Sequence, residues 1–136
     1  PWEAKEAGAK IVATGRSDFP NQVNNSLVFP GVFRGALDVR AGTITDEMAM
    51  AAAHELAQCA AAKGLGDEYI LPAMDEWEVV PRVAVATAMK AQEQGIARLL
   101  KTAEALHRSA ESRIGNARKA LSVLTGEGVI PPVSSA

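Results

Sequence analysis

Residues 9–33 read AKIVATGRSDFPNQVNNSLVFPGVF, and this stretch decides the fold that the sequence predicts. It opens on a short apolar run that ends at Thr14 and Gly15. A continuous apolar run, without strict alternation, is typical of a strand covered on both faces, as in a parallel α/β sheet. The pattern therefore predicts a buried strand over residues 9–14. The polar residues that follow would lie at its carboxyl end, where ligands bind in open α/β sheets.

Four amide side chains come next within five positions: Asn21, Gln22, Asn24 and Asn25. An amide donates and accepts hydrogen bonds at once, so a pair of them suits a carboxylate, hydroxyl or carboxamide of a ligand. Asn24 or Asn25 is also suited to cap the helix that the next apolar residues predict. The local pattern leaves both interpretations open.

The sequence after the amide-rich segment predicts mainly helices. Apolar spacing predicts a helical segment within residues 24–41, where Gly31 and Gly35 would allow another backbone to approach closely. Thr45 is an N-cap for an alanine-rich helix that ends at Lys63 and Gly64. Its inward stripe would be Met48, Ala52, Leu56 and Cys59.

Two more helices are predicted beyond an acidic loop at residues 64–80. Pro81 fits the first position of a helix that runs to Gly95. A longer helix over about residues 101–124 has one apolar seam, which we expect to be buried against a helix of the same chain or of a partner chain. Its members are Leu99, Ala103, Leu106, Ala110, Ile114, Ala117, Leu121 and Leu124. A frayed tail from Gly126 would follow.

Other residues with reactive side chains are better explained by structure. His54 and His107 have no second histidine or cysteine at metal-ligand spacing, so both are expected to be ordinary helical residues. The acids of the 64–80 loop lack the alternation of a calcium loop and are expected to be solvated. Cys59, the single cysteine, is expected to be a small core residue.

Composition excludes several functional classes. The 136 residues include 14 basic and 16 acidic ones, and a net charge of -2 argues against binding to nucleic acid or to an anionic membrane. We also expect no membrane anchor and no signal peptide, because no apolar stretch approaches the roughly 20 residues of a membrane span. One cysteine and no disulfide pair fit a cytoplasmic protein.

The stretch GRSDFPNQVNNSLVFPGVFRGALDVRA, residues 15–41, closely resembles the prokaryotic type of malic enzyme, a malate oxidoreductase that decarboxylates its substrate. The resemblance continues through ITDEMAMAAAHELA and ILPAMDEWEVVPRVAVATAMKAQEQGIAR. It thus covers about three quarters of the chain, which is far more specific than a short consensus such as GxGxxG.

The resemblance implies an α/β parent with a Rossmann-like NAD(P)-binding domain, of which this chain would be mostly α-helical with one or two short strands. Residues 1–100 would be the carboxyl-terminal part of that domain, and residues 101–136 a long helix and tail. The implied reaction converts malate to pyruvate and CO₂, with NAD or NADP as hydride acceptor and Mg or Mn polarising the keto oxygen.

The resemblance implies a binding role for four residues of this chain. Thr14 and Gly15 resemble positions on the nicotinamide side of the cofactor. Asn24 resembles the asparagine that contacts malate, beside the cofactor, and Asn25 resembles its neighbour. The family's catalytic tyrosine and lysine and its three metal-binding carboxylates match nothing in the sequence. Catalytic residues and metal ligands are therefore expected outside this chain.

The sequence starts at Pro1 without an initiator methionine and contains no Gly-rich dinucleotide fingerprint. We therefore expect the carboxyl-terminal portion of a longer, homo-oligomeric enzyme, inactive when isolated. The alternative is a noncatalytic helical module that serves interaction or oligomerisation. A GxGxxG unit upstream would favour the enzyme.

Overall fold

The computed structural model describes residues 1–131. Its helices, in chain order, are α1 (Trp2–Glu6), the short 3₁₀ helix η1 (Asn25–Leu27), α2 (Phe29–Asp38), α3 (Asp46–Lys63), α4 (Val79–Glu93) and α5 (Ala103–Gly126). None of the helices in this range is long and apolar enough to cross a membrane. The end of the predicted frayed tail, residues 132–136, lies outside the described residues.

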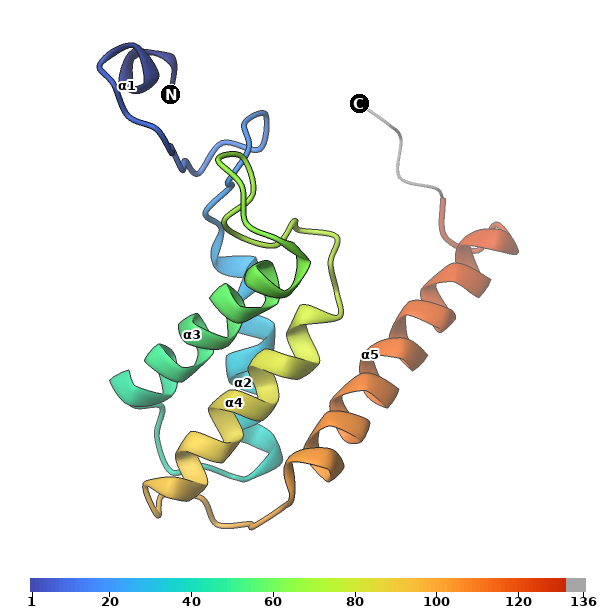
Figure 1. Cartoon of the computed structure of the whole chain (residues 1–136). Helices are drawn as coiled ribbons and strands as arrows, with labels where there is room; N and C mark the ends of the chain where they lie inside the picture. Colours follow the sequence, from blue (N-terminus) through green and yellow to red (C-terminus); the bar gives the residue numbers. More distant parts are fainter. Residues whose placement is uncertain (132–136) are drawn as a thin grey trace.

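Helix α4 is the centre of the fold, because α2, α3 and α5 all pack against it. Figure 1 shows α3 on one side of α4, α5 on the other side, and α2 crossing behind α4. Two apolar clusters hold these helices together. One joins η1, α2, α3 and α4 around Leu27, Leu56 and Val83, and the other joins α2, α3, α4 and α5 around Met48, Ala88 and Leu106.

The close approach predicted for Gly31 and Gly35 is confirmed, and α4 is the neighbour that requires it. A Cβ added to Gly31 would lie 2.6 Å from Val83 Cγ1, and one added to Gly35 would lie 2.3 Å from Ala84 O. Helix α4 lies against the face of α2 that carries both glycines.

Helix α3 follows its sequence signals closely. The Thr45 side chain accepts a hydrogen bond from Met48 N–H at 3.2 Å, so the predicted N-cap is confirmed. Gly64 ends the helix with a φ of 95°, a conformation that favours glycine. All four residues of the predicted inward stripe, Met48, Ala52, Leu56 and Cys59, are buried.

The strand predicted over residues 9–14 is absent: residues 1–131 contain no strand. A single parallel bridge between Thr14 and Gln22 stands in its place. Val23 N–H donates to Thr14 O at 2.8 Å, and Thr14 N–H donates to Asn21 O at 3.3 Å. A ladder needs a neighbouring strand of comparable length, and the described residues supply none. The expectation of one or two short strands is therefore wrong for this part of the chain.

Helix boundaries differ from the predictions in two places. The helical segment expected within residues 24–41 is divided into η1 and α2, because Pro30 lies at the start of α2 and fits a first turn. Helix α4 begins at Val79, two residues before Pro81, which is tolerated because the first four N–H groups of a helix have no partner within it.

The seam of α5 is buried only in its first half. Leu106 and Ala110 are buried against the bundle, whereas Leu121 is 55% exposed and Leu124 is 39% exposed. Figure 1 shows the reason, since the carboxyl-terminal part of α5 extends beyond the first turn of α4. Burial of the whole seam, as predicted, is therefore not found in the described chain.

Candidate functional site

The amide-rich segment forms one wall of a pocket of about 290 Å³. Val23 and Asn24, at the start of η1, line it together with Asn25. The other lining residues are apolar: Leu27, Val28, Phe29, Leu56 and Leu71. Polar groups at one wall of a largely apolar pocket are typical of a small-molecule site.

Asn24 uses one end of its side chain as a helix cap. Its Oδ1 accepts hydrogen bonds from Ser26 N–H at 3.1 Å and from the Ser26 hydroxyl at 2.7 Å. Its Nδ2 has no hydrogen-bond partner among residues 1–131, although the residue is half-buried and lines the pocket. The two interpretations that the sequence left open therefore concern different atoms of the same amide.

Asn25 is the first residue of η1 and is exposed at the pocket's edge. Thr14 lines a different and smaller pocket, of about 40 Å³, with Trp2 and Phe19. The structure thus brings Asn24 and Asn25 together and places Thr14 in another pocket. The segments that line the two pockets are linked by the backbone hydrogen bond that Val23 N–H donates to Thr14 O.

Gly15 is exposed, next to the bridge. The nearest atom to a Cβ built there is Val23 O, at 3.9 Å. Its backbone is therefore accessible to a ligand.

Asn21 is the amide whose role the sequence pattern did not indicate. It is 5% exposed and has a φ of 55°. Its Nδ2 donates to Val12 O at 3.1 Å and to Asp67 O at 2.9 Å, and its Oδ1 accepts from Ile70 N–H at 2.9 Å. Two of these partners lie 46 and 49 residues away in sequence, so local spacing contains no signal for them.

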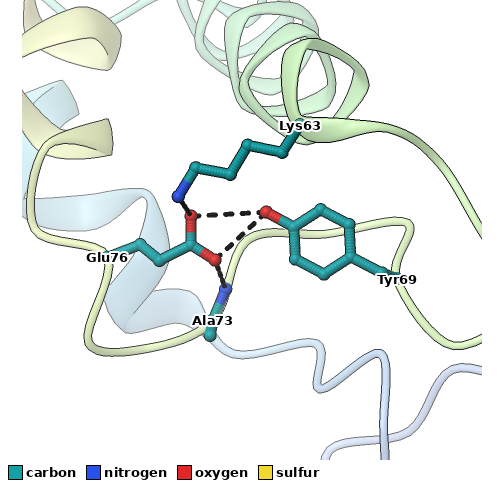
Figure 2. Close-up of polar contacts among 4 residues, drawn as sticks. All are labelled: Lys63, Tyr69, Ala73 and Glu76. Atoms are coloured by element: carbon teal, nitrogen blue, oxygen red, sulfur yellow. Dashed lines mark hydrogen bonds and ion pairs between the residues drawn. The ribbon is translucent and has the colours of Figure 1, made fainter.

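The acidic loop is more ordered than the sequence indicated. Glu76 is only 15% exposed in its side chain, and it accepts hydrogen bonds from Lys63, from the Tyr69 hydroxyl and from Ala73 N–H (Figure 2). Partial burial alone would raise the pKa of Glu76, but these three donors outweigh it and lower the pKa below the usual glutamate value. Glu76 thus ties the loop to the end of α3, which corrects the prediction of a wholly solvated loop.

No metal centre is assembled in the described range: residues 1–131 contain no group of three or more His, Cys, Asp or Glu side chains that could hold an ion. His54 pairs with Gln58 on α3 at 3.0 Å, and His107 lies 3.7 Å from Glu111 on α5. Burial raises the pKa of the Cys59 thiol, as expected of a core residue.

Comparison with known proteins gives a consistent result. The family described as "Malic enzyme, NAD binding domain" matches residues 8–92. A bifunctional malic/malolactic enzyme of Bacillus subtilis (strain 168) is 54% identical over 73% of this chain and 24% of its own length. An NADP-dependent malic enzyme of Rhizobium meliloti (strain 1021) is 48% identical over 65% of this chain and 13% of its own length.

Solved structures agree. A malic enzyme from Entamoeba histolytica superposes with a TM-score of 0.94 at 47% identity, over 98% of this chain and 28% of that chain. One from Pyrococcus horikoshii has a TM-score of 0.87 at 44% identity, over 93% of this chain and 29% of that chain. The chain therefore spans about a quarter or less of the length of the curated relatives named here.

Proposed function

The chain belongs to the malic enzyme family through its NAD binding domain, and from this premise we propose that it is part of an enzyme that oxidatively decarboxylates malate to pyruvate and CO₂. Relatives named as NAD-dependent and as NADP-dependent malic enzymes support a nicotinamide cofactor of either kind. The observation that carries the proposal is the Asn24 amide, with its cap at Oδ1 and an available Nδ2 in a residue that lines a pocket.

In the proposed mechanism, Asn24 binds malate and orients it. Nδ2 donates a hydrogen bond to a malate carboxylate, while Ser26 holds the amide plane fixed through its hydrogen bonds to Oδ1. Asn25, exposed at the pocket's edge, contacts the same substrate. The apolar residues of the pocket reduce access of water to the bound acid.

We place the cofactor beside Asn24, at Thr14 and Gly15. The accessible backbone of Gly15 and its short link to the Asn24 segment support this placement. When bound, NAD or NADP accepts the hydride from malate. The described residues do not fit Mg or Mn, because they contain no group of side chains that could hold an ion, and we propose that the metal ligands lie outside this chain.

We further propose that the chain is the carboxyl-terminal portion of its enzyme, with residues 1–100 as the last part of a Rossmann-like domain and residues 101–136 as a long helix and tail. The isolated bridge at Thr14 supports this, since a parallel sheet elsewhere in the enzyme would complete it. The exposed half of the α5 seam supports a homo-oligomer. A cytoplasmic location rests on the single cysteine.

The test is an assay of the full-length enzyme with malate, with NAD and NADP in turn, and with Mn present. We expect malate-dependent reduction of at least one cofactor, with pyruvate as the product. A folded enzyme that reduces neither cofactor with malate would refute the proposal. The noncatalytic alternative, a helical interaction module, predicts that negative result.

A further inference from the structure

The side chain of Asn21 connects the bridge segment to the acidic loop, whose contacting residues lie 46 and 49 positions further along the chain. Its two donors bond to Val12 O and Asp67 O, and its acceptor bonds to Ile70 N–H, all at 2.9–3.1 Å. Its backbone carbonyl also accepts from Thr14 N–H. The amide thus satisfies backbone groups on the bridge segment and on the loop that leads to α4 at the same time.

Asparagine fits this position for two independent reasons. Its φ of 55° is a left-handed conformation that Asn and Gly adopt more readily than other residues. Its side chain has two N–H donors and a carbonyl acceptor on one planar group, which aspartate lacks. Glycine would satisfy the backbone requirement and leave the three partners without their hydrogen bonds.

These contacts lead directly to the proposed malate pocket. Asn21 lies three residues before Asn24, and Ile70 immediately precedes Leu71. Asn24 and Leu71 both line the pocket, one from each of the segments that Asn21 joins. The separation between these two lining residues therefore depends on the Asn21 amide.

We propose that Asn21 is a positioning residue for malate, which acts by holding the Asn24 segment and the Leu71 segment at the spacing that the substrate requires. This inference rests on the proposed function. Asn21 itself is buried and fully hydrogen-bonded, so it acts through Asn24 and makes no contact with the substrate. Loss of its hydrogen bonds should weaken malate binding more than it slows turnover.

The experiment compares two Asn21 variants of the full-length enzyme. Asn21→Asp keeps the size of the side chain and the acceptor for Ile70, but it sets a carboxylate oxygen against the carbonyls of Val12 and Asp67. Asn21→Gly keeps the backbone conformation and removes all three side-chain bonds. We expect each to raise the KM for malate by about 10-fold or more, with kcat within about 3-fold of the wild type.

A control separates positioning from simple loss of stability. Leu106→Ala lowers stability in the α5 cluster, far along the chain from the pocket. All variants are assayed well below their melting temperatures, as measured by circular dichroism. The proposal expects Leu106→Ala to keep the malate KM within about 2-fold of the wild type despite its lower melting temperature.

The outcomes distinguish failure of the proposed function from failure of the positioning role of Asn21. A wild-type enzyme that does not oxidise malate refutes the proposed function. With an active wild type, Asn21 variants whose malate KM changes no more than that of Leu106→Ala refute the positioning role alone. Failure of both Asn21 variants to fold, while Leu106→Ala folds, also refutes it, because Asn21 would then be a structural residue.

Discussion

Glu76 shows how a single side chain can stabilise a loop that the sequence describes only as acidic. Its three donors lower its pKa, so its contribution to stability is complete above the usual glutamate pKa and is lost as pH falls through the lowered one. Glu76→Gln should therefore lower the free energy of unfolding by about 1 kcal/mol at pH 7. The difference from wild type should disappear at a pH below the lowered pKa.

Chemical denaturation of both proteins at neutral and at acidic pH measures this difference. Glu3→Gln is the matched control, because Glu3 is exposed and makes no ion pair within the described residues. A Glu76→Gln defect of the same size at both pH values would contradict the role assigned to its charge.

The residues of the site could be predicted from sequence only where their partners are local. The cap at Thr45 and the cap at Asn24 each involve a neighbour two or three residues away, and both follow from short-range rules. The role of Asn21 could not be predicted, because its partners Asp67 and Ile70 lie beyond α2 and α3 in the chain, and only the tertiary packing brings them to it.

At the scale of elements, the contact of α2 with α4 depends on the absence of a side chain at Gly35. A methyl group there would overlap Ala84 O and approach Thr87 Cβ to 2.9 Å, and both atoms lie within a packed helix. Gly35→Ala should therefore lower the free energy of unfolding by about 1–3 kcal/mol, since overpacking forces the two backbones apart.

Gly115→Ala is the control, because nothing lies within 4 Å of a Cβ built at Gly115 in α5. It should raise stability by about 0.5–1 kcal/mol through helix propensity alone. Melting curves for the two variants should shift in opposite directions. A Gly35→Ala protein as stable as Gly115→Ala would show that the close approach of α2 and α4 is not required.

The two halves of α5 should respond differently to the same substitution. Leu106→Ala removes a buried side chain and should lower the free energy of unfolding by about 2–5 kcal/mol. Leu121→Ala in this chain should change the free energy of unfolding by less than about 0.5 kcal/mol, because Leu121 is exposed.

The exposed half of α5 should matter for assembly. In the full-length enzyme, Leu121→Asp should weaken assembly, which sedimentation measures as a lower mass. An unchanged mass together with an unchanged melting temperature would exclude a partner at Leu121.

Elements whose start and stop signals lie in their own sequence could be predicted. Elements that form only when a segment distant in sequence pairs with them could not. Helix α3 has a cap, an apolar stripe and a terminal glycine in its own sequence. The strand expected at residues 9–14 has only an apolar run, and a run of this kind becomes a strand only when another strand pairs with it. Within residues 1–131, Gln22 supplies a single bridge.

In the whole molecule, the proposed function makes this chain one part of an active site. We predict that the isolated 136-residue chain neither oxidises malate nor binds NAD at micromolar concentrations. Dinucleotide affinity depends on a pyrophosphate held at a Gly-rich turn and a helix N-terminus, and the sequence has no such fingerprint. Micromolar binding of NAD in a calorimeter would contradict this prediction.

The central claim is that Asn24 binds malate through Nδ2 while Oδ1 caps η1, and one variant of the full-length enzyme separates the two. Asn24→Asp keeps an acceptor for Ser26, so its free energy of unfolding should stay near that of the wild type. Asn24→Ala should lower the free energy of unfolding by about 1 kcal/mol, because the cap is lost.

The decisive measurement is kcat/KM for malate in Asn24→Asp. Because this variant loses the Nδ2 donor and sets a carboxylate against an anionic substrate, the account predicts a decrease by a factor on the order of 10 to 100 or more in a fully folded enzyme. A kcat/KM equal to that of the wild type would contradict the account and leave Asn24 as a helix cap alone.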